Sequence, residues 1–145
     1  MGMKKNIQFQ CTDPWLLLAI IYACQQGGSS LSDILGYGDF INHAIFSLEE
    51  LQSGLHRLIK SGYVIKEKDK FLPTDKIIIP YHKFSKHKNS VSRDLQFIRT
   101  ELNAPEWSSN YDPTKANKSG GFKEINKDTY KMAYKEYAQK VKTDV

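Results

Sequence analysis

The sequence predicts a mainly α-helical protein with one small β-hairpin. Apolar residues recur at helical spacing in several segments, most clearly over residues 46–59. Two β-prone runs, 63–65 and 71–72, flank a charged tip at 66–70, which is the pattern of a hairpin. Of the 145 residues, 40% are hydrophobic and 26% are charged, as is typical of a soluble globular chain in which one domain is the default.

The helix expected over residues 47–61 has unusually complete end signals. Ser47 and Glu50 stand at the spacing of a capping box, and Phe46 and Leu51 stand where a hydrophobic staple would close. Gly62 follows the helix and is expected to end it in the left-handed conformation. The residues of its apolar face are Leu48, Leu51, Leu55, Leu58 and Ile59.

This helix, its exit IKSGYV (59–64) and the return FLPTDK (71–76) resemble the recognition helix and wing of winged helix-turn-helix domains. The resemblance covers residues 13–76, about half of the chain, and Pro73 departs from the usual pattern of the return. It implies a winged helix-turn-helix fold with added C-terminal helices, and the role of a DNA-binding bacterial transcriptional regulator. In this family the recognition helix enters the major groove and the wing, here 63–72, touches the adjacent minor groove or phosphates.

The resemblance also implies which residues would contact DNA. The expected readers on the recognition helix are Gln52, Ser53, His56, Arg57 and Lys60, and the expected wing contacts are Lys66, Lys68 and Lys70. Gln52 would suit adenine and Arg57 would suit guanine. Glu49 and Glu50 at the start of the helix disfavour a close phosphate.

The charge distribution leaves a second function open. Residues 1–75 hold seven basic and eight acidic residues, a net charge of −1, whereas residues 76–145 hold fourteen and eight, a net charge of +6. The positive charge therefore lies largely outside the segment that resembles a DNA-binding unit. The alternative to DNA binding is a winged-helix module that binds another protein.

Residues 1–12 are expected to form an N-terminal arm, and residues 13–80 the winged-helix domain. Asp13 is expected to cap a buried helix over 15–23, with Pro14 at its first position. A second helix is expected to start after Ser29 or Ser30 and to be extended, or broken near residues 36–39. Asp39, Asn42 and His43 either converge on a small ligand or serve as a helix cap and a backbone partner.

Beyond the wing, Ile77–Ile79 followed by Pro80 predicts a strand or an extended linker. Residues 81–104 combine a basic tract with an amphipathic helix. The tract either contacts the DNA backbone or is a solvated linker, and its candidate residues are Lys83, Lys86, Lys88 and Arg93. Residues 105–125 are expected to be a linker or partly disordered.

A last amphipathic helix is expected over residues 126–145. Its apolar stripe is a candidate dimer face and consists of Tyr130, Tyr134, Tyr137 and Val141. The stripe has the same spacing as that of the helix before residue 104, so the two helices are expected to pack together, on the winged helix, or across a dimer axis. The other face carries Lys127, Lys131, Lys135 and Lys142.

No catalytic, cofactor-binding or metal-binding motif is recognisable, so we expect neither an enzyme nor a bound cofactor or metal. Cys11 and Cys24 lack metal-ligand spacing and favour a reducing compartment. The longest apolar run, Trp15–Cys24, is too short to span a membrane, and no signal sequence is apparent. These features predict a cytoplasmic protein.

Overall fold

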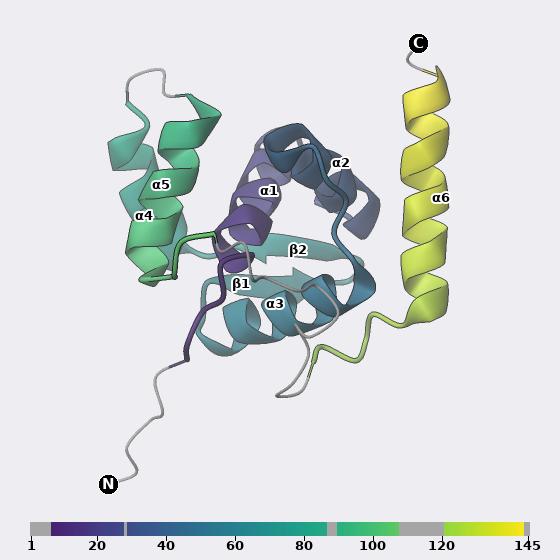
Figure 1. The fold of residues 1–145 in the computed structure, drawn as a ribbon, viewed down its shortest axis with the longest axis horizontal. Helices are drawn as coiled ribbons and strands as arrows, with labels where there is room; N and C mark the ends of the chain where they lie inside the picture. Colours follow the sequence, from purple (N-terminus) through teal and green to yellow (C-terminus); the bar gives the residue numbers. More distant parts are fainter. Residues whose placement is uncertain (1–6, 28, 87–89, 108–120, 144–145) are drawn as a thin grey trace, which may run out of the picture.

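The computed structural model describes residues 7–27, 29–86, 90–107 and 121–143, and it confirms a mainly α-helical fold with a small antiparallel hairpin (Figure 1). In chain order the elements are α1 (Asp13–Gln25), α2 (Leu31–Asn42), α3 (Leu48–Lys60), β1 (Val64–Glu67), β2 (Lys70–Pro73), α4 (Asp75–Phe84), α5 (Val91–Leu102) and α6 (Lys127–Thr143). Helix α1 lies at the centre of the fold, with α5 on one side and α2 on the other.

Helix α1 is buried nearly all round, as its uniformly apolar sequence predicts. Helices α2, α3 and α5 and strand β2 all pack against it. The predicted cap is wrong: the residue at the N-cap position is Thr12, and Asp13 is fully buried inside the first turn. Its carboxylate accepts the backbone N–H of Gln10 at 2.7 Å and faces α3 rather than solvent.

Helix α2 runs without a break through Gly36 and Gly38. Ser30 caps it through a complete capping box with Asp33. A Cβ on Gly38 would lie 2.3 Å from Cε2 of Phe46, and the carbonyl of Gly38 accepts the indole N–H of Trp15 at 2.8 Å. At this position the glycine allows close packing against the aromatic rings and does not end the helix.

Helix α3 begins and ends where its sequence predicts. Ser47 and Glu50 form the capping box, and Phe46 and Leu51 are both fully buried. Gly62 takes a φ of 86°, and the N–H groups of Gly62 and Tyr63 bond back to the carbonyls of Ile59 and Leu58. This is the Schellman pattern that satisfies the last carbonyls of a helix.

The hairpin pairs β1 with β2 from Val64–Pro73 to Glu67–Lys70, with Lys68 in the turn at a φ of 57°. Val64 and Phe71 point into the core. The N–H of Phe71 also donates to the carbonyl of Ser29 at 3.0 Å, so the segment before α2 borders β2. We call β1, β2 and their turn the wing.

The predicted strand at Ile77–Ile79 is wrong, because these residues lie inside α4. Ile77 and Tyr81 are buried one helical turn apart, so burial of this face outweighs the β-branched sequence. Pro80 stands within the helix and leaves the carbonyl four residues earlier without its helical partner. Ser90 caps helix α5, which packs on α1 and α4.

The apolar stripes of helices α5 and α6 do not pack against each other. Helix α5 lies against α1, whereas α6 lies against α2 on the other side of the molecule (Figure 1). Asn126 caps α6, since its side chain accepts the N–H of Thr129 at 2.9 Å. Of the alternatives predicted for these two stripes, the structure matches the second: each helix packs on the elements that precede it in the chain.

Candidate nucleic-acid interface

The side of α3 that faces away from α1 is narrow. Gln52 and His56 are half-buried and Lys60 is exposed, and these three occupy successive turns. They are the predicted readers that remain on the outer side of the helix. The other two, Ser53 and Arg57, lie elsewhere.

Ser53 and Arg57 are buried, so their prediction as outward-facing base readers is wrong. The Nε of Arg57 donates to Oδ2 of Asp13 at 2.6 Å, and Nη2 donates to Oδ1 at 2.9 Å. The hydroxyl of Ser53 lies 3.4 Å from Nη2. Burial raises the pKa of the Asp13 carboxyl, and the charge and hydrogen bonds of Arg57 oppose that rise. The Arg57–Asp13 pair joins α3 to α1. Neither the Arg57 nor the Ser53 side chain is therefore free to contact a base.

The chain itself covers the first half of the outer face of α3. The backbone N–H of Phe122 donates to the carbonyl of Gln52 at 2.8 Å, and the side-chain amide of Gln52 donates to the carbonyl of Ile125 at 2.6 Å. Ile125 is 2% exposed. We call residues 121–126 the covering segment. It occupies the position at which Gln52 would otherwise reach a base.

The start of α3 is covered in the same way. The hydroxyl of Tyr130 on α6 donates to the carbonyl of Phe46 at 2.6 Å. Burial raises the pKa of the Tyr130 hydroxyl, and the nearby carboxylates of Glu49 and Glu50 add to that rise. A helix end with two carboxylates and a packed tyrosine presents no site for a phosphate.

The linker predicted over 105–125 is ordered where it is described. Trp107 contacts Trp15 edge-on, with ring centroids 6.1 Å apart, and Arg99 pairs with Glu106 at 3.1 Å. Phe122 contacts Phe71 of the wing at 5.9 Å. Residues 108–120 of the predicted linker lie outside the described residues.

The wing presents its lysines to solvent as predicted. Lys66, Lys68 and Lys70 are all exposed, together with Glu67 and Asp69. Lys66 pairs with Glu124 of the covering segment at 3.3 Å, which fixes the side of the wing against that segment. The tip of the wing (66–70) therefore carries three exposed lysines and two exposed acids, a net charge of +1.

The basic tract lies on the opposite flank. Lys83 is on α4 and Lys86 follows it, while Arg93 is on α5, and all three are exposed. Figure 1 places α4 and α5 on the side of α1 away from α6. Lys88 lies outside the described residues.

Half of the predicted dimer face is used within the chain. Tyr137 donates its hydroxyl to Oδ2 of Asp39 at 2.6 Å, and this bond raises the pKa of Tyr137 to about 12. Tyr130 is bonded to α3 as described above. Tyr134 and Val141 remain 44% and 47% exposed. The tyrosine stripe therefore secures α6 to its own domain first.

The three polar residues at the end of α2 do not converge on a common site. Asp39 accepts the Tyr137 hydroxyl, and it stands inside a continuous helix, so its predicted role as a cap is wrong. His43 is the exposed C-cap with a φ of 53°. Asn42 lines a cavity of about 180 Å³ beside Trp107. Within the described parts of the chain, no group of three or more His, Cys, Asp or Glu could hold a metal ion.

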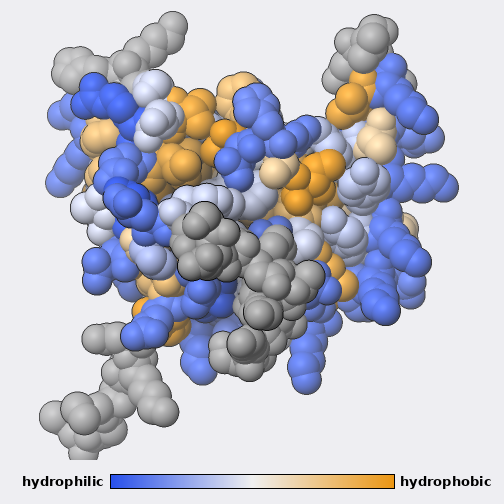
Figure 2. All heavy atoms as spheres, in the orientation of Figure 1, coloured by the Kyte–Doolittle hydropathy of each residue, from blue (hydrophilic) through white to orange (hydrophobic). Residues whose placement is uncertain are grey.

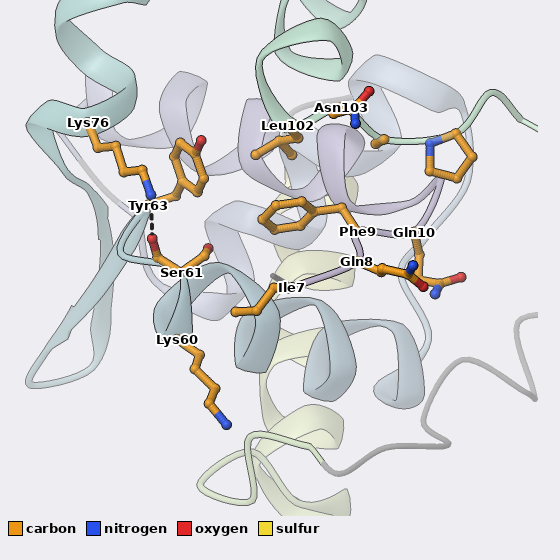
Figure 3. A pocket seen from close by; sticks show the side chains of 12 residues that line it. Ile7, Gln8, Phe9, Gln10, Lys60, Ser61, Tyr63, Lys76, Leu102 and Asn103 are labelled. Carbon is orange, nitrogen blue, oxygen red and sulfur yellow. Dashed lines mark hydrogen bonds between the residues drawn. The ribbon is translucent and has the colours of Figure 1, made fainter. Parts of the chain in front are cut away.

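A larger open cavity of about 1020 Å³ lies at the C-terminal end of α3 (Figure 3). Nζ of Lys76 donates to the carbonyl of Ser61 at 2.7 Å and lies 4.3 Å from the centroid of the Tyr63 ring. Phe9 meets Tyr63 edge-on at 5.9 Å, whereas Lys60 points away from the cavity. This cavity could not be predicted from the sequence, because its walls come from the arm, the α3–β1 turn, α4 and the end of α5.

In the part of the chain that the structure describes, no helix has both the length and the apolar character needed to cross a membrane. Comparison with models of known families, with curated proteins and with solved structures finds no match to this chain in any of the three.

Proposed function

We propose that the chain binds double-stranded DNA through the phosphate backbone, with the wing as a principal contact and without base reading by α3. The observation that carries this proposal is the contrast between the two predicted contact sets. The three wing lysines are exposed, whereas Ser53 and Arg57 are buried and Gln52 is bonded to the covering segment.

Lysines on an exposed hairpin suit phosphates better than bases. An ammonium group is a compact point charge, whereas base recognition relies on bidentate donors and acceptors. Backbone contacts of this kind hold a protein on DNA but carry no sequence information directly. We therefore expect salt-sensitive binding with little preference among duplexes, which fits a regulator or an architectural DNA-binding protein.

The test is the fluorescence anisotropy of a labelled random duplex of about 20 base pairs, titrated at salt concentrations from ~50 to ~200 mM. The variant Lys66→Gln/Lys68→Gln/Lys70→Gln should lower the slope of log K against log salt by up to ~2.7, since each phosphate contact contributes about 0.9. No binding by the wild-type chain at ~50 mM salt, or an unchanged slope in the variant, contradicts the proposal.

A second candidate function is a protein-interaction module. Phe40 is 61% exposed and contacts Tyr22 and Tyr37, and Trp107 is 55% exposed. Figure 2 shows hydrophobic side chains gathered between α5 and α2. Exposed aromatic side chains are enriched at protein interfaces. Absence of duplex binding in the salt series would favour this function over the first.

A further inference from the structure

Helix α6 carries a row of lysines along the side that faces away from α2. Lys127, Lys131 and Lys135 follow one another at four-residue steps, Lys142 continues the row, and all four are exposed. The packed side of the same helix consists of Tyr130, Ala133 and Tyr137. We call Lys127, Lys131, Lys135 and Lys142 the lysine row.

The spacing of the lysine row suits a regular polyanion. Four residues of helix rise ~6 Å, and the fifteen steps from Lys127 to Lys142 rise ~22 Å. The duplex carries one phosphate charge per ~1.7 Å of its axis when both strands are counted, so phosphates lie within reach along the length of the row.

The charge of the row is not neutralised by its own helix. Residues 127–143 hold five lysines and the two acids Asp128 and Glu136, a net charge of +3. Glu136 lies beside Lys140 at 3.8 Å, and Lys140 also pairs with Asp33 of α2 at 3.4 Å. The acid nearest the middle of α6 is thus engaged by a lysine outside the row.

Two contacts join the segment before α6 to the wing. The covering segment leads directly into α6 and meets the wing through Phe122–Phe71 and Glu124–Lys66. Figure 1 shows the turn of the hairpin pointing toward the side on which α6 stands. A ligand on the turn of the wing therefore lies near the covering segment that leads into α6, while α4 contacts β2 at the other end of the hairpin.

We propose that the lysine row is a second contact with the phosphate backbone of the duplex that the wing binds. This inference rests on the proposed function, and it adds a surface that resemblance to a winged helix does not provide. The row and the wing lie on either side of the covering segment, with net charges of +3 for residues 127–143 and +1 for residues 66–70.

The packing of α6 argues against an anionic membrane as the ligand. An interfacial helix binds a membrane by burying its apolar face in the acyl boundary. Tyr130 and Tyr137 of that face are held by the chain itself, because their hydroxyls bond to the α2–α3 loop and to α2. Met132, Tyr134 and Val141 stay 73%, 44% and 47% exposed, so the vesicle measurement below is the one that separates a membrane from a duplex.

The test compares two variants with the same change of charge. The first is Lys131→Gln/Lys135→Gln/Lys142→Gln on the lysine row, and the control is Lys83→Gln/Lys86→Gln/Arg93→Gln on the opposite flank. Glutamine is a good helix former, so circular dichroism should be unchanged in both. The probe is a random duplex of about 20 base pairs over the ~50 to ~200 mM salt series.

The row variant should bind the duplex on the order of 10²-fold more weakly at ~100 mM salt, and its salt slope should fall by up to ~2.7. The control should keep the wild-type slope. Equal weakening in both variants would show a general charge effect and would overturn the inference.

Two further outcomes separate this inference from the function on which it rests. If only the wing variant loses affinity, the row is not a contact and DNA binding stands. If the wild-type chain ignores the duplex, DNA binding fails and the inference fails with it. Binding to vesicles with phosphatidylserine in the absence of duplex binding would assign the row to a membrane surface instead.

Discussion

The buried pair Arg57–Asp13 provides the sharpest test of how α3 is oriented. Asp13 has no exposed surface, the side chain of Arg57 is 9% exposed, and two hydrogen bonds of 2.6 and 2.9 Å join them. In Arg57→Ala the Asp13 carboxylate stays buried with the Gln10 N–H but without its cation. Breaking a buried pair by removing one partner costs about 3–5 kcal/mol.

The assay is urea denaturation followed by tryptophan fluorescence, because Trp15 is buried in the core and reports on its packing. Arg57→Ala should lower the free energy of unfolding by about 3–5 kcal/mol, out of a total of roughly 5–15 kcal/mol for an ordinary domain. Lys60→Ala is the matched control on the same helix, and a change at this exposed site should stay within about 0.5 kcal/mol.

The apolar double variant Asp13→Leu/Arg57→Met separates the pair from simple loss of packing. Replacing a buried pair by hydrophobic residues of similar size is often neutral, so this variant should be more stable than Arg57→Ala. An Arg57→Ala protein as stable as the control would refute the reasoning and return Arg57 to the outer face. If the reasoning holds, a loss of DNA binding in Arg57→Ala reports on folding and not on base reading.

Three further predictions concern the packing of the helices. Gly38→Ala should destabilise the fold by about 1–3 kcal/mol in thermal denaturation, because the new Cβ would lie 2.3 Å from the Phe46 ring. Asp94→Asn should cost about 2 kcal/mol in the same assay, since the buried carboxylate accepts the Tyr22 hydroxyl at 2.5 Å and a second tyrosine hydroxyl at 3.0 Å. The pKa of Tyr137 is raised to about 12, so its contribution to the docking of α6 should be complete below pH 10 and lost as the pH rises to 12. Ultraviolet titration of the tyrosines should show this component in the wild-type chain and not in Tyr137→Phe.

The features of α3 that could be predicted from the sequence are those written within a few residues. Ser47 and Glu50 satisfy each other across one turn, and Gly62 needs only its own lack of a Cβ to end the helix. Such signals do not depend on the rest of the chain. The order of helices and hairpin followed from them.

The orientation of α3 depended on a residue 44 positions away and could not be read locally. Ser53 and Arg57 look outward on polarity alone, because Asp13, the partner of Arg57, is a distant neighbour on α1 and Ser53 lies beside the Arg57 guanidinium. One signal was present: a carboxylate at the start of a helix that is apolar on all sides needs a buried cation. For the same reason, Gly36 and Gly38 are interpreted from the sequence alone as a possible break in the second helix. The aromatic rings that leave no room for a Cβ at these positions belong to residues outside that helix.

Base reading by Gln52 would cost more than it returns. Uncovering Gln52 gives up two hydrogen bonds to the covering segment, each worth about 0.5–1.5 kcal/mol. It also exposes Ile125, whose burial is worth about 1.5–3 kcal/mol. A good bidentate contact to a base returns only about 1–3 kcal/mol of discrimination. The contacts proposed for the wing and the lysine row require no such opening, and each would add to the affinity for a duplex at low salt. The balance of these terms, and not the resemblance of the helix alone, favours the backbone over the bases.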